Sequence, residues 1–539
     1  GLSVRKTAHI AAAFARDGVR GRSITQLAAS GRERDFFRWV RSPVEPYNTE
    51  VPIMATVGLD KKIVTAEVGF VLPSDMLAAM YCKGEEVMRQ CILGADGAAG
   101  IASYWAKEDP SFLRELDLSH DEALHTIPMG FHVDGVPKWH DESASFWSWM
   151  TPMTTASSLV TRHCVVGIST SKVCVETRRA VLDIIAWDLQ SLRTGVWPVA
   201  DHLGREFAAG SSRARRAGTR IAGPWTACFA FWKGDQEAAV DEHLIKNHYR
   251  CNFVCDFCYA SKVHMYLSYG DLTESPNWLD TMCVDDADPS PWRKVAGYSR
   301  RRRLWDGQIH DYVGLDRGVD PDEALHRVTV LAQTWARTRK LDLSMKPLST
   351  SRLSYTGYKY PELDTRVKAA RTRVLFEFVT HMALDIESTL MPPGATALEL
   401  MRVRMICTSV WALSLCLSTW YKGDRPFLSH LQTTTSVALG RLHLRSYQWL
   451  AADALRARKL LFYIRPKHHY LWHLLSATTA SKFNPMQLSN FIDEDHMKAL
   501  RGISLSCHPR TFLKTWARRY ILKRHLVWHR IRSEKARVR

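Results

Sequence analysis

Two aspartates stand where a sheet could bring them together. Asp134 in the segment FHVDGV and Asp235 in the segment FWKGDQEA each follow apolar residues that are typical of a strand. They are 101 residues apart (235 − 134), but neighbouring strands would place them side by side. Because two carboxylates that close are unfavourable without a cation, we expect Mg²⁺ or Mn²⁺ there, in a site that holds two cations about 4 Å apart for phosphoryl transfer on DNA. Taken singly, an aspartate beside a glycine also fits an ordinary turn.

A third carboxylate is expected from a later helix. Residues 490–503, NFIDEDHMKALRGI, predict a helix whose first turn holds Asp493, Glu494 and Asp495. Acidic residues in a first turn are also favoured by the helix dipole, which is a sufficient structural explanation for them. We take Glu494 as the third catalytic candidate. The 259 residues between Asp235 and Glu494 (494 − 235) would then hold a helical insertion.

Three cysteines follow Asp235 closely. Cys251, Cys255 and Cys258 lie in the segment YRCNFVCDFC, and a CxxC pair supplies two thiolates on a tight turn, as tetrahedral zinc requires. One CxxC is only half of a site, so Cys251 is a candidate third ligand. The alternative is that the three are small buried residues. The candidates for the fourth ligand are His243, His248, His264 and His310.

Other metal-binding residue types lie far along the chain. His469 and His473 in RPKHHYLWHL are four residues apart, which would put them on one face of a helix. Cys507 and His508 follow later. Either pair could complete a metal site, but histidines beside basic residues could equally contact phosphate or pack. We favour packing.

Apolar patterns predict the elements that would position these residues. IPMGFHVDGV, SFWSWM and HCVVGIST predict three strands, and TACFAFW predicts a fourth that leads to Asp235. Between the third and fourth strands a helix is predicted from Val175 to Leu192. This order is the opening of an RNase H-like fold, although order alone is weak evidence. Further expected elements are strands within 52–72, a helix over 74–91, helices from 321, from 361 and over 431–460, and a loop at 340–360.

We therefore expect an α/β fold, more strictly α+β, with an RNase H-like mixed-sheet core, a large helical insertion and a basic helical C-terminus. A chain of 539 residues exceeds one ordinary core. The expected units are a basic, partly disordered N-terminal segment at 1–50, a small α/β region at 51–125, the first part of the core with the cysteine cluster at 126–265, a mainly helical insertion at 266–480, and C-terminal helices that complete the core and carry a basic tail at 481–539.

The chain is strongly basic, with a net charge of +18 from 73 lysines and arginines against 55 acidic residues. This excess favours polyanionic partners, above all DNA. The charge is clustered in runs, which favours nucleic-acid binding or nuclear import over solvated faces. We expect a nuclear DNA-binding protein, and the sequence leaves open a homo-oligomer. The candidate nucleic-acid contacts are Arg213, Arg215, Arg216, Arg300, Arg301, Arg302, Arg303, Arg518, Arg519 and Lys523.

Neither secretion nor a membrane span is expected. Residues 1–22 contain no apolar stretch of signal-peptide length. The twelve scattered cysteines then indicate a reducing compartment, where a cysteine cluster suggests metal. The most apolar stretch, 405–421, is interrupted by serine and threonine and is shorter than the roughly 20 residues that a span needs. We expect a buried helix there and no membrane partner.

Together these segments resemble a large repetitive protein family of protist genomes, which in turn is similar to CACTA-type and KDZ-type DDE transposases. Such transposases have an RNase H-like core, an Asp on the first strand, a GD motif after the fourth strand followed by a CxxC, and a Glu after a helical insertion. The resemblance implies Asp134, Asp235 and Glu494 as catalytic residues. It also implies zinc at Cys255 and Cys258, with His310 in GQIHDYVG as the preferred additional ligand. The matching segments are HVDGVP, SFWSWM, WDLQSLRTGVWP, FWKGD with CDFC, RPKHHYLWHL, FIDED and SCHPRT, which cover most of residues 50–530.

Three functions are open on this basis. The first is a metal-dependent, transposase-like DNA nuclease and strand transferase with Mg²⁺ or Mn²⁺ at the carboxylates and structural Zn²⁺ at the cysteines. The second is a catalytically inactive DNA-binding or assembly protein that retains the fold. The third is a scaffold without a nucleic-acid role.

Overall fold

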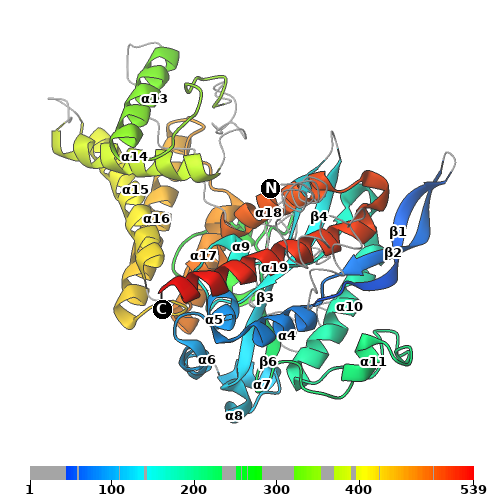
Figure 1. Ribbon diagram of the computed structural model, residues 1–539. Helices are drawn as coiled ribbons and strands as arrows, with labels where there is room; N and C mark the ends of the chain where they lie inside the picture. Colours follow the sequence, from blue (N-terminus) through cyan, green and yellow to red (C-terminus); the bar gives the residue numbers. More distant parts are fainter. Residues whose placement is uncertain are drawn as a thin grey trace.

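The computed structural model contains a mixed sheet and a large group of helices, so the expected combination of α and β elements is confirmed (Figure 1). Of the predicted site residues, Asp235, His310 and the run Arg300, Arg301, Arg302 and Arg303 lie outside the residues that the structure describes. The described residues are 44–57, 60–108, 110–138, 142–233, 251–255, 258–263, 265–281, 321–353, 369–389, 396–423, 425–489 and 491–538.

The centre of the fold is a four-stranded sheet in the order β5-β4-β3-β6. β3 runs antiparallel to β4 and parallel to β6, and β4 runs antiparallel to β5. Helix α10 lies between β5 and β6 in the chain and packs against β6. The predicted order of three strands, a helix and a fourth strand is therefore confirmed. The bounds are β3 Thr126–Pro137, β4 Ser143–Met150, β5 His163–Ser169, α10 Val175–Thr194 and β6 Thr226–Lys233.

Burial explains these elements. The side chains of β4 and β5 are buried along almost their whole length, so both faces of the sheet must be covered. Helix α10 presents Val181, Ile185 and Leu189 to the core at helical spacing. It ends at Gly195, which takes the left-handed conformation that favours glycine.

A two-stranded hairpin precedes the sheet, with β1 at Tyr47–Val57 and β2 at Asp60–Phe70, and confirms the two predicted strands. The N–H of Val71 donates to the carbonyl of Val165 at 2.7 Å, which joins the end of β2 to β5. The prediction of a single helix over 74–91 is wrong. Helix α4 (Pro73–Lys83) stops at Gly84, whose φ is 103°, and α5 (Glu85–Met88) then runs into the π-helical turn η1 (Arg89–Leu93).

The C-terminal helices return to the sheet. α18 (Phe491–Ser506) packs against β3, and α19 (Phe512–Val538) packs against β2 and β5. Trp516 and Trp528 of α19 are fully buried in the same core as the strands. Figure 1 shows α19, in red, lying across the strands.

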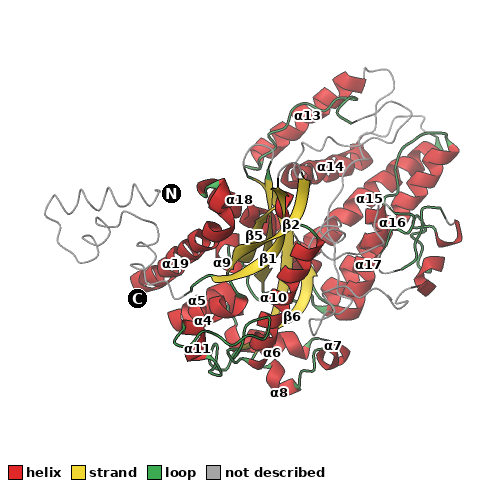
Figure 2. Ribbon diagram, turned by 90° about the vertical axis from the view of Figure 1, so that its right-hand side faces the viewer, coloured by secondary structure: helices red, strands yellow, loops and turns green. Residues whose placement is uncertain are grey.

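The remaining long helices lie to one side of the sheet, and Figure 2 shows the strands between α19 and the α15–α16 pair. α15 packs along α16, and these two contact α14 and α17. The predicted helix starts at 321 and near 431 are confirmed; of the helix expected from 361, the part that is described begins at Ala369. The bounds of these long helices are α13 Pro321–Thr338, α14 Ala369–Thr389, α15 Ala397–Lys422, α16 His430–Arg456 and α17 Pro466–Ser481.

The structure also contains shorter elements. The shorter helices are α6 Gly97–Ala106, α7 Pro110–Glu115, α8 His120–Ala123, α9 Ser158–Thr161 and α11 Ser212–Arg216. The short helical turns are η2 Thr170–Lys172, η3 Met265–Leu267, η4 Asn277–Thr281, η6 Pro485–Leu488 and η7 Pro509–Thr511.

Helix α15 contains the apolar stretch 405–421. Within the described part of the chain, it is the one helix whose length and composition would allow a membrane span, a test that core helices also pass. The expected burial is found on one side only, because Trp411 and Leu415 are 39% and 37% exposed while Val410 and Trp420 are fully buried.

The β4–β5 register yields a stability prediction. Gly167 pairs with Phe146, and a methyl group added at Gly167 would lie 2.2 Å from Cε1 of that buried ring. We expect Gly167→Ala to reduce the free energy of unfolding by about 1–3 kcal/mol, measured by chemical denaturation. Gly502→Ala is the control, because nothing lies within 4 Å of its added methyl group. Equal stability of the two variants would contradict the packing of Phe146 over Gly167.

Candidate metal centre

Four buried side chains from two distant segments meet in one place. The ligand atoms of Cys255, Cys258, His469 and His473 all lie within 4.8 Å of one another. Sγ of Cys258 lies 3.3 Å from Nε2 of His469 and 3.6 Å from Nε2 of His473. Sγ of Cys255 lies 3.5 Å from Nε2 of His473. No side chain of the four is more than 7% exposed, so the cluster is closed to solvent.

The cysteines are positioned by a short irregular hairpin. Phe253 forms an antiparallel bridge with Ser261, and the N–H of Val254 donates to the carbonyl of Ala260 at 2.9 Å. The hydroxyl of Tyr470, on α17, donates to the carbonyl of Val254 at 2.9 Å. This bond ties the cysteine turn to the helix that carries the histidines.

The histidines are positioned by α17. His469 and His473 are one turn apart and therefore share a face of the helix. Pro466 occupies the first helical position, where its missing N–H costs nothing. The ring of His468, on a different side, accepts a hydrogen bond from the N–H of Arg465 at 3.0 Å and so does not join the cluster.

The distances fit a tetrahedral metal. With zinc–ligand bonds of about 2.3 Å to sulfur and about 2.0 Å to nitrogen, a tetrahedral ion separates sulfur from nitrogen by roughly 3.6 Å and nitrogen from nitrogen by roughly 3.3 Å. Three of the sulfur–nitrogen distances, from 3.3 to 3.6 Å, agree, and the two Nε2 atoms are slightly closer, at 3.0 Å. Thiolate and imidazole ligands favour zinc over magnesium, which prefers oxygen. The cluster can therefore hold a metal such as zinc.

Burial also sets the protonation states of two of the candidate ligands. It raises the pKa of the Cys255 thiol well above its usual value, and a hydrogen bond with Cys258 adds to this. It lowers the pKa of His469 well below its usual value, with His473 as the second cause. In the absence of a metal the first group is a neutral thiol and the second a neutral imidazole. Metal binding must therefore displace a thiol proton, and the affinity must rise with pH.

Aromatic rings close the site. The buried ring of Trp278 lies 4.3 Å from that of His469 and 5.1 Å from that of His473, measured between ring centroids. Its indole N–H donates to the carbonyl of Asp271 at 3.0 Å, and the indole N–H of Trp472 donates to the carbonyl of Thr273 at 2.9 Å. A closed site with four protein ligands is structural in type, because a catalytic zinc keeps one position open.

Sequence reasoning found half of this ligand set. Cys255 and Cys258 are part of the cluster, as expected. Cys251, the expected third ligand, is not part of it, and His310 lies outside the described residues. The expectation that His469 and His473 only pack is wrong, because both rings present Nε2 to the sulfur atoms. Their four-residue spacing was the signal that could have identified them.

The predicted catalytic carboxylates are only partly described. Asp134, near the end of β3, is half-buried, and its Oδ1 accepts the N–H of Gly135 at 2.7 Å. Glu494 is exposed on α18. Its neighbour Asp493 is buried instead and forms ion pairs with Arg162 and Lys233. Because Asp235 lies outside the described residues, the triad and its Mg²⁺ or Mn²⁺ stay predictions.

Two of the predicted nucleic-acid contacts have partners inside the fold. Arg213 and Arg216, on α11, pair with the buried Asp75 at 2.7 and 2.5 Å. Their guanidinium groups also lie over the rings of Tyr47 and Trp197, at 4.7 and 3.7 Å from the ring centroids. These contacts explain the two arginines structurally, so we do not carry them into a DNA surface. The side chain of Arg215, between them, donates to the carbonyl of Gly210.

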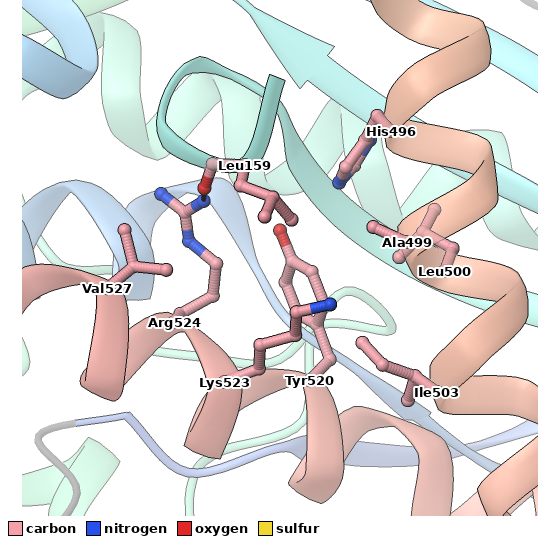
Figure 3. A pocket seen from close by; sticks show the side chains of 9 residues that line it. All are labelled: Leu159, His496, Ala499, Leu500, Ile503, Tyr520, Lys523, Arg524 and Val527. Carbon is pink, nitrogen blue, oxygen red and sulfur yellow. Dashed lines mark hydrogen bonds between the residues drawn. The ribbon is translucent and has the colours of Figure 1, made fainter. Parts of the chain in front are cut away.

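The basic residues predicted on α19 are differently placed. Arg518 is exposed, and Arg519 donates to the carbonyl of Ser506. Lys523 is half-buried at the rim of a small cavity between α9, α18 and α19 (Figure 3). Arg524 also lines this cavity and donates to the carbonyl of Leu159. The other lining residues are Leu159, His496, Ala499, Leu500, Ile503, Tyr520 and Val527, which are mostly aliphatic and do not make a phosphate site.

Comparison of the sequence with models of protein families and with curated proteins finds no match. The case for a metal therefore rests on the four side chains themselves. Their types, their burial and their gathering within 4.8 Å of one another agree with one closed site of four ligands.

The ligand set can be tested by metal content. The purified protein should carry about one zinc ion per chain, and Cys258→Ser and His473→Ala should each lose it, because a tetrahedral structural site needs all four ligands. Cys251→Ser is the matched control and should retain its zinc. Elemental analysis by mass spectrometry gives the zinc-to-protein ratio. Loss of zinc from the Cys251 variant, or full retention in the Cys258 variant, would assign the ligands differently.

Proposed function

We propose that this chain is a zinc-stabilised DNA-binding protein of transposase ancestry, built on an RNase H-like core and acting in the nucleus. The sheet supports this proposal through its order and directions. Three antiparallel strands, a helix and a fourth strand parallel to the first are the arrangement expected for the start of such a core. Because one fold can serve many functions, the proposal depends on the candidate metal site.

The position of the metal centre is the observation that carries the proposal. Its CxxC half follows β6, and its HxxxH half follows the long helices α13 to α16. One ion would thus close the helical segment onto the chain shortly after the fourth strand. The transposases that the sequence resembles also carry a CxxC after the fourth strand and a helical insertion before the last carboxylate.

In the active form of this proposal, Asp134, Asp235 and Glu494 bind Mg²⁺ or Mn²⁺. The cations supply activation of the attacking oxygen and stabilisation of the leaving oxygen on DNA. Asp134 contributes a half-buried carboxylate at the end of β3, and Glu494 an exposed one on the helix that packs against β3. The oxygen ligands suit these hard cations.

A catalytically inactive DNA-binding or assembly protein is the second candidate. The pairing of Asp493 would favour it if Asp493, one position before Glu494, were the third carboxylate. In the first turn of α18 the buried acid is Asp493, and both of its oxygens are already engaged by Arg162 and Lys233. A chain that has lost its cation site would still keep the sheet, the zinc and the basic surface.

DNA binding should be driven by phosphate contacts and should weaken steeply with salt. We expect Arg518→Gln combined with Arg532→Gln, two exposed positions on α19, to reduce the slope of log affinity against log salt concentration by about 2. Filter retention of labelled duplex DNA at several salt concentrations measures this slope. Lys61→Gln with Lys62→Gln, exposed on β2, removes the same charge and should leave the slope unchanged. Retention that does not depend on salt would favour a scaffold without a nucleic-acid role.

The nuclease and inactive candidates differ in one assay. With Mn²⁺, the protein should nick supercoiled DNA, and Asp134→Asn or Asp235→Asn should abolish nicking while DNA retention is kept. Asp121→Asn, at an exposed position on α8, is the control and should nick normally. Gel electrophoresis of the plasmid forms reports the result. DNA retention without nicking by the unaltered protein would establish the inactive candidate.

A further inference from the structure

A buried charge cluster lies where α18 meets the sheet. Nε of Arg162 lies 2.7 Å from Oδ1 of Asp493, and Nζ of Lys233 donates to Oδ2 of Asp493. Nζ of Lys233 also donates to the carbonyl of Ser489, two residues before α18, at 2.8 Å. The exposed fractions of Arg162, Lys233 and Asp493 are 4%, 0% and 1%. The cluster therefore joins the last residue of β6, the residue before β5 and the first turn of α18.

The groups keep their charges inside the protein. Burial raises the pKa of Asp493, but Lys233 and Arg162 outweigh it and hold the pKa below its usual value. Burial lowers the pKa of Lys233 to about 8, against the attraction of Asp493. Burial also lowers the pKa of His132, on β3, to about 4, so its ring is neutral at pH 7. Two cations and one anion remain.

Stability is a weak reason for such a cluster. Burying ions costs solvation, and well-packed apolar residues are often equally stable or more so. A buried ion pair does, however, select one geometry, because any displacement leaves a charge unpaired in a medium of low dielectric constant. The cluster is best explained by what it holds in place.

The register of β3 and β6 shows which parts of the fold the charge cluster holds together. Lys233 pairs with His132 in the parallel β3–β6 ladder, and Asp134 lies two residues further along β3, so His132 and Asp134 share a face of the sheet. The side chain of Lys233, the register partner of His132, reaches Asp493, so that face is turned toward α18. Glu494 is the next residue after Asp493. The cluster thus fixes α18 relative to the strand that carries Asp134.

The support continues to α19. The guanidinium of Arg524 donates to the carbonyl of Leu159 (Figure 3). It also donates to the carbonyls of Val160, at 3.0 Å, and Arg162. The hydroxyl of Tyr520 accepts the N–H of Cys164 at 2.7 Å. Arg162 is therefore held through its backbone by α19 while its side chain holds α18.

We propose that Arg162, Lys233 and Asp493 are positioning residues that set the placement of Glu494 relative to Asp134 for cation binding. This inference rests on the proposed carboxylate site. A positioning role can be told apart from a purely electrostatic one, because the two change the affinity for a divalent cation in opposite directions. Removing the Lys233 cation should by itself strengthen the binding of a nearby divalent cation, whereas loss of the positioning contact weakens it.

The test is Mn²⁺ affinity in the zinc-loaded full chain, measured from the electron paramagnetic resonance signal of free Mn²⁺. We expect Lys233→Met to bind Mn²⁺ at least about tenfold more weakly, equivalent to about 1.4 kcal/mol. Zinc content and far-UV circular dichroism establish that the variant is folded. Lys498→Met removes the same charge from an exposed pair with Asp495 on α18 and should leave Mn²⁺ affinity unchanged or slightly higher.

Arg162→Lys is the second variant, for the case that Lys233→Met does not fold. It keeps the charge but loses the Nε contact, and should weaken Mn²⁺ binding at least about threefold, or about 0.6 kcal/mol. Unchanged or tighter Mn²⁺ binding in a folded variant overturns the positioning role and leaves the proposed function intact. No Mn²⁺ binding by the unaltered protein overturns the carboxylate site itself.

Discussion

Two small buried polar clusters determine which distant stretches of the chain lie side by side. The Cys–His cluster brings Cys258 to His469 across 211 positions, and the ion pair between Arg162 and Asp493 spans 331. The entropy cost of closing a loop grows only with the logarithm of its length. A small number of contacts can therefore hold distant segments together. The contacts must be buried, because in the protein interior the loss of one partner leaves the other group unpaired at a large cost in free energy.

The basic side chains of this protein fall into two groups, one engaged inside the fold and one exposed to solvent. Arg162, Lys233 and Arg524 are buried and hold secondary-structure elements together through carboxylate or carbonyl oxygens. Arg213 and Arg216 do the same from the short, more exposed helix α11. The net charge of +18 therefore overstates the positive charge that is exposed at the surface. It is the exposed face of α19 that keeps the character expected for phosphate contacts, because its basic side chains there reach solvent.

The predicted elements agree with the observed ones where the local pattern of apolar residues is strong. The strands around Asp134 and the helix over 175–194 were predictable because continuous apolar runs and a clear helical period leave little choice. The helix expected over 74–91 was wrong because Gly84 interrupts it at a positive φ. The metal ligands were half predictable. A CxxC is a local signal on a tight turn, whereas its partners are chosen by whichever helix packs against that turn.

The sequence by itself determined the element order, the basic character and the residue types that could bind metal or cations, because these depend on neighbours along the chain. Only the tertiary structure decided which histidines meet the cysteines and that Asp493, not Glu494, is the buried acid of α18. The physical reason is that ligand sets and ion pairs depend on distances of a few ångströms between segments hundreds of residues apart. Local propensities carry no information about those distances.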